Sequence, residues 1–510
     1  MNLVEYIFQA ADKLNRWSET AILCGDEQTT YKQLFRRVKK FGRLLETLGV
    51  GRGERVAIAA CDCPEFIISF LGAAAVGAVA VPVSTMMTAN ELSYVLKHCG
   101  AKVLILTSDQ IEKVQSIRSD LDTLENILLV NGEAEGILSF DEMLARVEEA
   151  EILDVSDDTL AFILYTSGST GQPKGATHIH RNLPFTVETF CKQVLRVEPS
   201  DRLFSSSRLF FAYGLGNSLS FPLASGATTI LCKERPTPQV IAEVFQQNRP
   251  TIFFAVPAAY RALIEFISKG NALETDSIRF CVSAGEKLPE GIFYEWKTWT
   301  GLDILDGIGS TEMLQMFISN SKDRIVPGSS GQVVPGYEAK LLDQQGQEIE
   351  GAGTGHLMIK GASASVGYWN DALKTDATMQ GEWMRTGDLY RRDADGNFWH
   401  EGRSDDLFKV KGLWVSPVEV EDALLSCADV LEAAVVPGLN EDGMNAVSAY
   451  VVMRADAGDG MEERLKTELK TKLPPYKRPS VIHFMEQLPR TATGKLQRFK
   501  LRERRADTSD

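Results

Sequence analysis

Short apolar runs rich in β-branched residues alternate with segments of helical spacing, and this rhythm limits the possible fold more than any other feature of the sequence. The apolar runs lie at 56–59, 103–106, 127–130, 228–231, 251–254 and 278–281. Between them, segments such as 64–77 and 89–98 repeat apolar residues every three or four positions. Strands that alternate with helices form βαβ units around a largely parallel sheet. We therefore expect an α/β fold whose large N-terminal body has several subdomains of layered sheets and helices.

The pattern changes twice toward the C-terminus. From about 330 to 400, glycine-punctuated strands predict a small β-rich subdomain. A compact unit then follows, with strands and helices expected at 407–410, 417–426, 433–436, 447–453, 461–473 and 481–484. We place the body at 1–404 and a small, mobile α+β C-terminal lid at 405–510.

Charge and cysteine usage exclude several classes of protein. The chain has 510 residues and a formal net charge of −15, which argues against a nucleic-acid partner because such a partner requires a basic face. The eight cysteines show no C-x-x-C spacing, so they predict neither a disulfide framework nor a zinc site and fit a cytoplasmic protein. The first dozen residues carry acids and do not resemble a secretory signal.

One apolar run, 66–83, raises the question of a membrane span. Gly72, Gly77 and Pro82 interrupt it, and its last residues read as a strand. We therefore expect a buried helix followed by a buried strand, and no membrane span.

The glycine-rich segment 165–175, Tyr-Thr-Ser-Gly-Ser-Thr-Gly-Gln-Pro-Lys-Gly, follows the apolar run 160–164 and predicts a loop that binds the phosphates of ATP. Glycines such as Gly168 let backbone N–H groups approach an anion, and Lys174 adds a positive charge. Neutral hydroxyl donors come from Thr166, Ser167, Ser169 and Thr170. A Walker loop is excluded by spacing, because Pro173 takes the place of its second glycine and Gly175 follows the lysine.

This loop resembles the signature of the adenylate-forming superfamily, which contains acyl- and aryl-CoA ligases, luciferases and the adenylation domains of peptide synthetases. Further matching motifs lie in the family's order at 283–286, 306–312, 385–388, 402–406 and 489–495. The resemblance covers nearly the whole chain. It implies an ATP-dependent, AMP-forming acid–thiol ligase that uses ATP, Mg²⁺ and coenzyme A.

The resemblance also implies the catalytic residues. Lys495 is expected to bridge the acid oxygen and the α-phosphate, offsetting the repulsion between two anions. Thr311 is expected to hold the phosphate, and Glu312 to bind Mg²⁺ through a hard oxygen ligand. Asp388 is expected to accept both ribose hydroxyls, with Arg403 donating to the ribose.

Other residues match the nucleotide slot and the lid. Gly285, Glu286, Asp306 and Gly307 resemble the walls and polar edge of the adenine slot. Asp405 resembles the hinge at which the lid swings, after which Lys411 and Gly412 would line a pantetheine tunnel. His178 and His180 suggest a metal pair, but a structural role is the better interpretation because no further acid stands nearby in the sequence.

The segment 210–217, Phe-Phe-Ala-Tyr-Gly-Leu-Gly-Asn, resembles the benzoate–CoA ligase branch and implies a flat aromatic pocket formed by Ala212, Tyr213 and Gly309. Benzoate ligases usually have His-Ile after Thr-Glu-Met-Leu, whereas this chain has Gln315 and Met316. A glutamine can pair with a ring amino or hydroxyl group, and a flexible methionine leaves room for a substituent. We therefore expect 2-aminobenzoate (anthranilate) or hydroxybenzoate to be preferred over plain benzoate.

Alternatives to an aryl-acid:CoA ligase stay open at this point. The same first half-reaction would serve a stand-alone adenylation enzyme that loads a carrier protein, and the sequence separates the two poorly. A non-catalytic nucleotide sensor is disfavoured because Lys174, Glu312, Asp388 and Lys495 are all present. A homodimer is one alternative for the oligomeric state, which the sequence does not determine.

Overall fold

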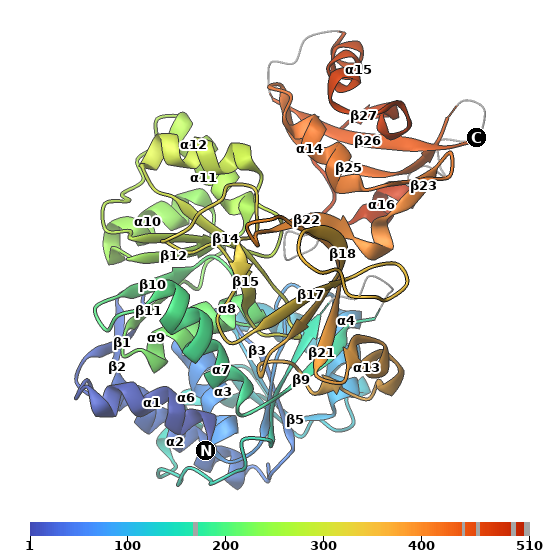
Figure 1. Ribbon diagram of the computed structural model, residues 1–510. Helices are drawn as coiled ribbons and strands as arrows, with labels where there is room; N and C mark the ends of the chain where they lie inside the picture. The colour runs from blue at the N-terminus through green and yellow to red at the C-terminus, as the bar shows by residue number, and fades with distance from the viewer. Residues whose placement is uncertain (167–171, 441–443, 455–459, 491–495, 504–510) are drawn as a thin grey trace.

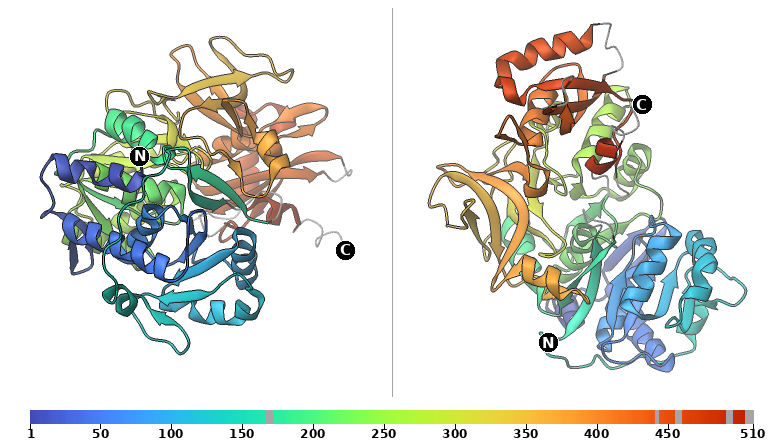
Figure 2. Two further views of the ribbon diagram at one scale, coloured as in Figure 1. Left: turned by 90° about the horizontal axis from the view of Figure 1, so that it is seen from below. Right: turned by 90° about the vertical axis from the view of Figure 1, so that its right-hand side faces the viewer.

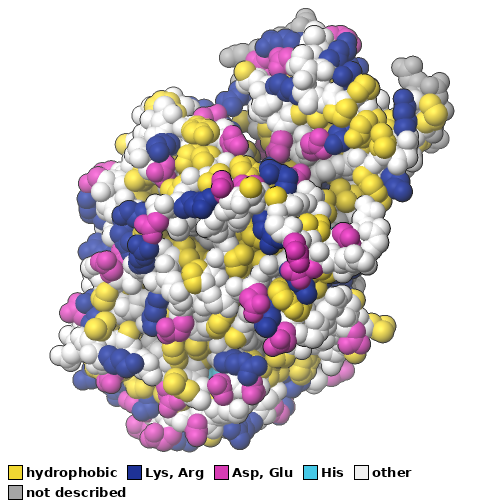
Figure 3. Space-filling view, in the orientation of Figure 1, with side chains coloured by type: hydrophobic (Ala, Val, Ile, Leu, Met, Phe, Trp, Pro, Cys, Tyr) yellow, Lys and Arg dark blue, Asp and Glu magenta, His cyan; other side chains and the backbone are white. Residues whose placement is uncertain are grey.

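The computed structural model describes residues 1–166, 172–440, 444–454, 460–490 and 496–503. Three sheets form the large N-terminal part, and a smaller unit follows toward the C-terminus (Figure 1). Figures 1 and 2 place this smaller unit at one end of the molecule, next to β22 and away from the N-terminus. Figure 3 shows acidic and basic side chains intermixed over the face of Figure 1.

The largest sheet has nine strands and is parallel from β14 to β1, with antiparallel strands at its edges. Its order is β16 (Gln332–Val333), β15 (Met316–Ser319), β14 (Ile304–Gly309), β13 (Phe280–Ser283), β12 (Ile252–Ala255), β10 (Arg202–Ser205), β11 (Thr228–Leu231), β1 (Thr20–Cys24) and β2 (Glu27–Thr30).

The second sheet has eight strands, of which β9 and β19 are antiparallel additions to a parallel set. Its order is β19 (Gly367–Tyr368), β9 (Lys174–Ile179), β8 (Leu160–Thr166), β4 (Val79–Pro82), β3 (Arg55–Ala59), β5 (Ala101–Leu106), β6 (Asn126–Leu129) and β7 (Leu138–Ser139).

Helices cover both sheets, and a shared helical layer lies between them. One face of each sheet belongs to a common core with α1 (Leu3–Lys13), α2 (Tyr31–Thr47), α3 (Pro64–Ala75), α7 (Asn182–Thr186), η3 (Val187–Leu195), α8 (Ala212–Leu215), η4 (Gly216–Ser220) and α9 (Phe221–Ala224). The outer face of the eight-stranded sheet packs on α4 (Ala89–Cys99) and α5 (Ile111–Ile117). The outer face of the nine-stranded sheet packs on α10 (Pro238–Asn248), α11 (Pro257–Ser268) and α12 (Glu290–Thr300). The predicted layered α/β body is confirmed.

Local sequence explains where several of these helices begin. Asn2, Thr30 and Thr88 each accept a backbone N–H of the first turn, while the Glu or Gln three residues later reaches back to the cap. These reciprocal bonds satisfy donors that a helix start otherwise leaves unpaired. Helix α4 ends at Gly100, whose φ of 62° favours glycine.

The apolar run 66–83 forms the buried helix α3 and the buried strand β4, as predicted. No helix within the described ranges has both the length and the apolar character needed to cross a bilayer.

Residues 330–400 contribute strands to three sheets. The antiparallel five-stranded sheet contains β17 (Glu338–Leu342), β18 (Gly353–Lys360), β20 (Met379–Gln380), β21 (Trp383–Arg392) and β22 (Phe398–Arg403). However, β16 extends the nine-stranded sheet and β19 extends the eight-stranded one. The β-rich character follows the glycine spacing, whereas these long-range pairings have no local sequence signal.

The C-terminal unit combines a hairpin, a three-stranded sheet and helices. Its elements are β23 (Phe408–Val410), β24 (Leu413–Val415), α14 (Pro417–Leu425), β25 (Val430–Leu439), β26 (Asn445–Met453), α15 (Met461–Lys472), β27 (Pro479–Phe484) and α16 (Arg498–Glu503). Its order of strands and helices follows the predicted one closely. The boundary at 404/405 stays a prediction.

Helices α2 and α3 approach closely at two glycines. A Cβ atom at Gly72 would lie 2.7 Å from Cδ1 of Phe41, and one at Gly42 would lie 2.9 Å from Cγ1 of Val76. Larger residues would force the two helices apart, because a packed core has no spare volume.

We predict that Gly72→Leu lowers the midpoint of thermal unfolding by at least about 2 °C, since overpacking a core typically costs roughly 1–3 kcal/mol. Gly291→Ala is the matched control, because Gly291 lies in α12 with open space around the added Cβ. Differential scanning calorimetry checks both variants. Equal midpoints for Gly72→Leu and the wild type would contradict the packing argument.

Candidate functional site

Several of the predicted site residues lie where parallel strands of the nine-stranded sheet end. Ala212 and Tyr213 follow β10, Glu286 follows β13, Asp306 lies within β14, and Thr311 comes directly after it. Open α/β sheets bind ligands outside the carboxyl ends of their strands. The fold thus brings segments about a hundred residues apart in the chain to one edge.

Gln315 ties α8 to β15 through its amide. Its Nε2 donates to the carbonyl oxygen of Tyr213 at 3.2 Å and to Oδ1 of Asn217 at 3.1 Å, while its Oε1 accepts from the backbone N–H of Met316 at 3.1 Å. Both amide hydrogens are therefore used inside the protein, and only Oε1 keeps capacity for a ligand. Pairing of Gln315 with a ring substituent stays a prediction, and it is now limited to a substituent that donates a hydrogen bond to Oε1.

Glycines allow the predicted aryl-pocket residues to pack this closely. A Cβ at Gly309 would lie 2.7 Å from the carbonyl oxygen of Gln315, and one at Gly307 would lie 2.4 Å from Cε of Met316. Tyr213 donates from its hydroxyl to the carbonyl oxygen of Val282 at 3.2 Å, and burial raises its pKa. The phenol therefore stays neutral, and Tyr213 would offer an uncharged wall to the predicted pocket.

The base of the predicted phosphate loop is a pair of strand residues. Thr166 and Lys174 are partners across β8 and β9. Burial lowers the pKa of Lys174, and the Lys374 ammonium lowers it further. Four loop residues and one lid residue lie outside the described part of the chain, namely Ser167, Gly168, Ser169, Thr170 and Lys495.

The Thr311–Glu312 segment is held from the eight-stranded sheet and the chain beside it. Nε2 of His178 lies 2.9 Å from the carbonyl oxygen of Thr311. The backbone N–H of Ser365 donates to the carbonyl oxygen of Glu312 at 2.7 Å. Burial lowers the pKa of His178 to about 4, so the neutral ring donates through Nε2. The Tyr368 hydroxyl donates to Oε1 of Glu312 at 2.6 Å. These bonds fix both the backbone and the carboxylate.

The sequence analysis anticipated one of these supporting residues and missed another. His178 has the structural role that we expected, but its bond to Thr311 places it directly behind the site. Tyr368 was not predicted, because only the pairing of β19 with β9 brings it near Glu312. His180 points elsewhere and accepts from the backbone N–H of Leu3 at 3.1 Å.

The carboxyl group of Asp306 is suited to a polar ligand atom. Asp306 is 4% exposed, and its Oδ1 has no hydrogen-bond partner among the described residues. Burial raises its pKa to about 8. A buried polar atom left without a partner is costly, and an exocyclic amino group of a purine would supply one. The predicted adenine slot fits this observation.

Asp388 and Arg403 are neighbours across β21 and β22. Nη1 of Arg403 donates to Oδ1 of Asp388 at 3.2 Å and to the carbonyl oxygen of Thr386 at 2.9 Å. Burial opposes ionisation of Asp388, but the nearby His400 and Arg403 hold its pKa below the ordinary value. An ionised, oriented acceptor of this kind suits a pair of ribose hydroxyls.

Ion pairs join the body to the C-terminal unit beside the predicted adenine slot. Nη1 of Arg490 lies 3.4 Å from both carboxylate oxygens of Glu286, and Nζ of Lys287 lies 2.6 Å from Oδ2 of Asp422. Gly285 directly precedes Glu286 and Lys287 in the chain, and its φ of 94° favours glycine.

The predicted hinge and tunnel residues are exposed. Asp405 lies in a single helical turn, η5 (Ser404–Asp406). Lys411 and Gly412 form the two-residue turn between β23 and β24, with φ angles of 51° and 81°. This is the geometry of a tight hairpin turn. The hinge and tunnel roles stay predictions.

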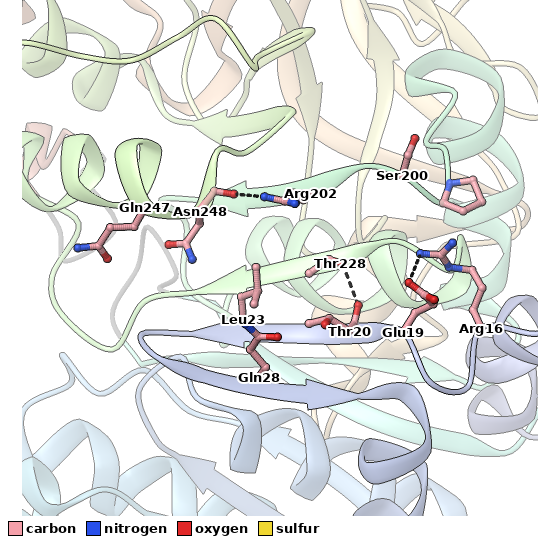
Figure 4. Close-up of a pocket in the computed structure, with 11 residues that line it drawn as sticks. Arg16, Glu19, Thr20, Leu23, Gln28, Ser200, Arg202, Thr228, Gln247 and Asn248 are labelled. Atoms are coloured by element: carbon pink, nitrogen blue, oxygen red, sulfur yellow. Dashed lines mark hydrogen bonds and ion pairs between the residues drawn. The ribbon is translucent and has the colours of Figure 1, made fainter.

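A polar cavity of about 350 Å³ lies away from these residues (Figure 4). It sits at the opposite strand ends, where β1, β10 and β11 begin, and Arg16, Glu19 and Arg202 are among its lining residues. None of the predicted site residues lines it. Its position and polar lining do not suit an aryl acid.

Residues 8–369 match the AMP-binding enzyme family, and residues 419–495 match the AMP-binding enzyme C-terminal domain. A benzoate–CoA ligase of Thauera aromatica is 41% identical over 507 residues, which cover 97% of this chain and 96% of that protein. An anthranilate–CoA ligase of Pseudomonas aeruginosa is 35% identical over 459 residues, which cover 88% of this chain and 87% of that protein.

Among solved structures, the anthranilate CoA ligase AuaEII in complex with anthranoyl-AMP superposes with a TM-score of 0.94 at 37% identity, covering 100% of this chain and 98% of that one. The sequence match extends over both parts of the chain, and the structural match repeats their arrangement. The chain therefore belongs to the AMP-binding enzyme family.

Proposed function

We propose that this protein is an aryl-acid:CoA ligase that activates benzoate or a ring-substituted benzoate. It joins the acid to AMP, releases pyrophosphate, and then transfers the acyl group to coenzyme A. The similar benzoate, hydroxybenzoate and anthranilate ligases support this substrate class.

The observation that carries the proposal is the position of the segment from Gly309 to Glu312. Gly309, a proposed wall of the aromatic pocket, packs tightly against the backbone of Gln315, and Glu312 lies near enough to Lys174 to act on its charge. A carboxylate on a ring in this pocket therefore points toward a bound triphosphate. Such positioning converts a reaction between two partners into one within a single complex.

In the first half-reaction a carboxylate oxygen attacks the α-phosphorus of ATP, and the bond to the bridging oxygen of pyrophosphate breaks. Thr311 holds the α-phosphate, and Lys495, which lies outside the described residues, offsets the charge of both anions. Asp306 takes the adenine amino group, and Asp388 with Arg403 takes the ribose. In the second half-reaction the thiol sulfur attacks the acyl carbon, AMP leaves, and the thiol proton passes to solvent.

Mg²⁺ fits the site through Glu312. Described residues include no cluster of three or more His, Cys, Asp or Glu side chains that could hold a metal ion. One oriented carboxylate is nevertheless sufficient, because Mg²⁺ is usually held by one or two carboxylates together with substrate phosphates. When bound, the ion neutralises charge on the phosphates. The protein's contribution is to fix Glu312 through Tyr368.

The C-terminal unit acts in this proposal as a lid with its hinge at Asp405, so that Lys411 and Gly412 face the pantetheine arm in the second half-reaction. We keep the division at 1–404 and 405–510 on this basis. A carrier protein in place of coenzyme A is the alternative acceptor. The cytoplasmic location and a homodimer stay predictions.

We predict that an aryl acid is required for pyrophosphate release. Among benzoate, 2-aminobenzoate, 4-hydroxybenzoate and a medium-chain fatty acid, a benzoate should give the highest kcat/KM, because the proposed pocket offers an aromatic wall at Tyr213. A coupled pyrophosphate assay with free coenzyme A checks this. Preference for the fatty acid would refute the aryl pocket, and activity only with a carrier protein would favour the alternative.

Lys495→Ala should lower aryl-acid-dependent ATP–pyrophosphate exchange by at least about 10²-fold, because a charge that acts on the reacting atoms is lost. Lys500→Ala, which removes a nearby exposed lysine, is the control and should exchange at the wild-type rate. Unchanged exchange in Lys495→Ala would contradict the proposed role.

Tyr368→Phe should weaken the effect of Mg²⁺ on ATP binding by about 10-fold or more, since groups that orient a metal ligand commonly contribute 10–100-fold to metal affinity. Isothermal titration of ATP with and without Mg²⁺ measures this directly. Tyr337→Phe is the control, because it removes another buried hydroxyl, which is bonded to Oγ of Ser363 at 2.8 Å and not to the Glu312 carboxylate. The same Mg²⁺ effect in both variants would show that Tyr368 does not position Glu312.

A further inference from the structure

A series of hydrogen bonds holds the helical turn that carries Lys374 beside the base of the predicted phosphate loop. Strand β19 pairs with β9, and the backbone N–H of Trp369 donates to the carbonyl oxygen of Gly175 at 2.7 Å. The first turn of α13 (Ala372–Thr378) is then fixed to β19, because Oγ1 of Thr375 accepts from the backbone N–H of Tyr368 at 2.9 Å. Lys374 belongs to that turn.

These contacts hold the turn that carries Lys374 beside β9, whose first residue is Lys174, and the charge of Lys374 acts on Lys174. Burial lowers the pKa of Lys174 most, and the positive charge of Lys374 lowers it further. Within the described ranges, neither lysine has a carboxylate oxygen within 4.0 Å. Like charges held together without a contacting acid repel each other, so the arrangement favours a bound anion.

Two acids near Lys174 also hold hydrogen bonds to other groups. Asp371 and Glu312 both act on Lys174 from a distance. Oδ1 of Asp371 accepts from the backbone N–H of Lys374 at 2.9 Å, and Oε1 of Glu312 accepts from the Tyr368 hydroxyl at 2.6 Å. These carboxylates offset part of the positive charge at Lys174 from a distance, but among the described residues neither lies within 4.0 Å of either ammonium group.

We propose that Lys374, together with Lys174, binds the β- and γ-phosphates of ATP and the pyrophosphate that they become. This inference rests on the proposed function. Two cations match a diphosphate group, which carries several negative charges, better than they match the single α-phosphate. Lys374 is a binding residue that no sequence motif indicated, because its approach to Lys174 depends on the β9–β19 pairing.

Isothermal titration of ATP and of AMP, each without an aryl acid, tests the proposal. Lys374→Gln should weaken ATP binding about 10-fold, because one charge-assisted contact is lost. Binding of AMP should change less than about twofold, since AMP lacks the β- and γ-phosphates. Lys374→Arg should restore most of the ATP affinity, because it keeps the charge.

Lys360→Gln is the matched control. Nζ of Lys360 contacts carboxylates of Glu338 at 3.3 Å and Glu382 at 3.0 Å on the five-stranded sheet, so its loss should leave both affinities unchanged. Equal weakening of ATP and AMP by Lys374→Gln, or no weakening of ATP, would overturn the proposal. ATP and AMP are both titrated without an aryl acid. If no aryl acid proves to be a substrate, that result would therefore count against the proposed function and not against the role of Lys374.

Discussion

The site depends on the hydrogen bonds that hold the backbone between Gly309 and Glu312. This segment leaves the nine-stranded sheet, yet its carbonyl oxygens accept from His178 on β9 and from the backbone of Ser365. Buried backbone groups must be paired, so these bonds link two sheets at one place. Glu312 lies near enough to Lys174 to act on its charge. Without this link, the proposed aromatic pocket and the predicted phosphate loop would belong to independent parts of the body.

Burial and charge divide the site into two halves with different chemistry. On the acid side, Tyr213, Gln315 and Met316 pack against glycines and offer an uncharged wall. On the proposed nucleotide side, Lys174 is half-buried and Asp388 is buried, while the exposed Arg403 lies beside Asp388. An aryl carboxylate fits this division, because its ring is apolar and its carboxylate must meet cations.

Much of the architecture could be predicted from sequence because it is encoded locally. Apolar runs gave the parallel strands, capping residues began the helices, and 66–83 became a buried helix and strand. The motif order also identified residues that the fold brings to one edge, such as Tyr213 and Gln315. Residues that depend on pairing between distant strands escaped prediction. Tyr368 and Lys374 approach the site only because β19 joins β9, and the internal bonds of Gln315 depend on where Asn217 lies.

A crystal structure with a non-reactive aryl-acyl sulfamoyl adenosine tests the central claim most directly, because this compound resembles the acyl-adenylate. The account predicts that its ring lies between Tyr213 and Gly309, its sulfamoyl group beside Thr311, and its ribose at Asp388. A ring bound elsewhere, for example in the polar cavity near Arg16, or a ribose far from Asp388, would contradict the claim that one segment joins the acid and nucleotide sites.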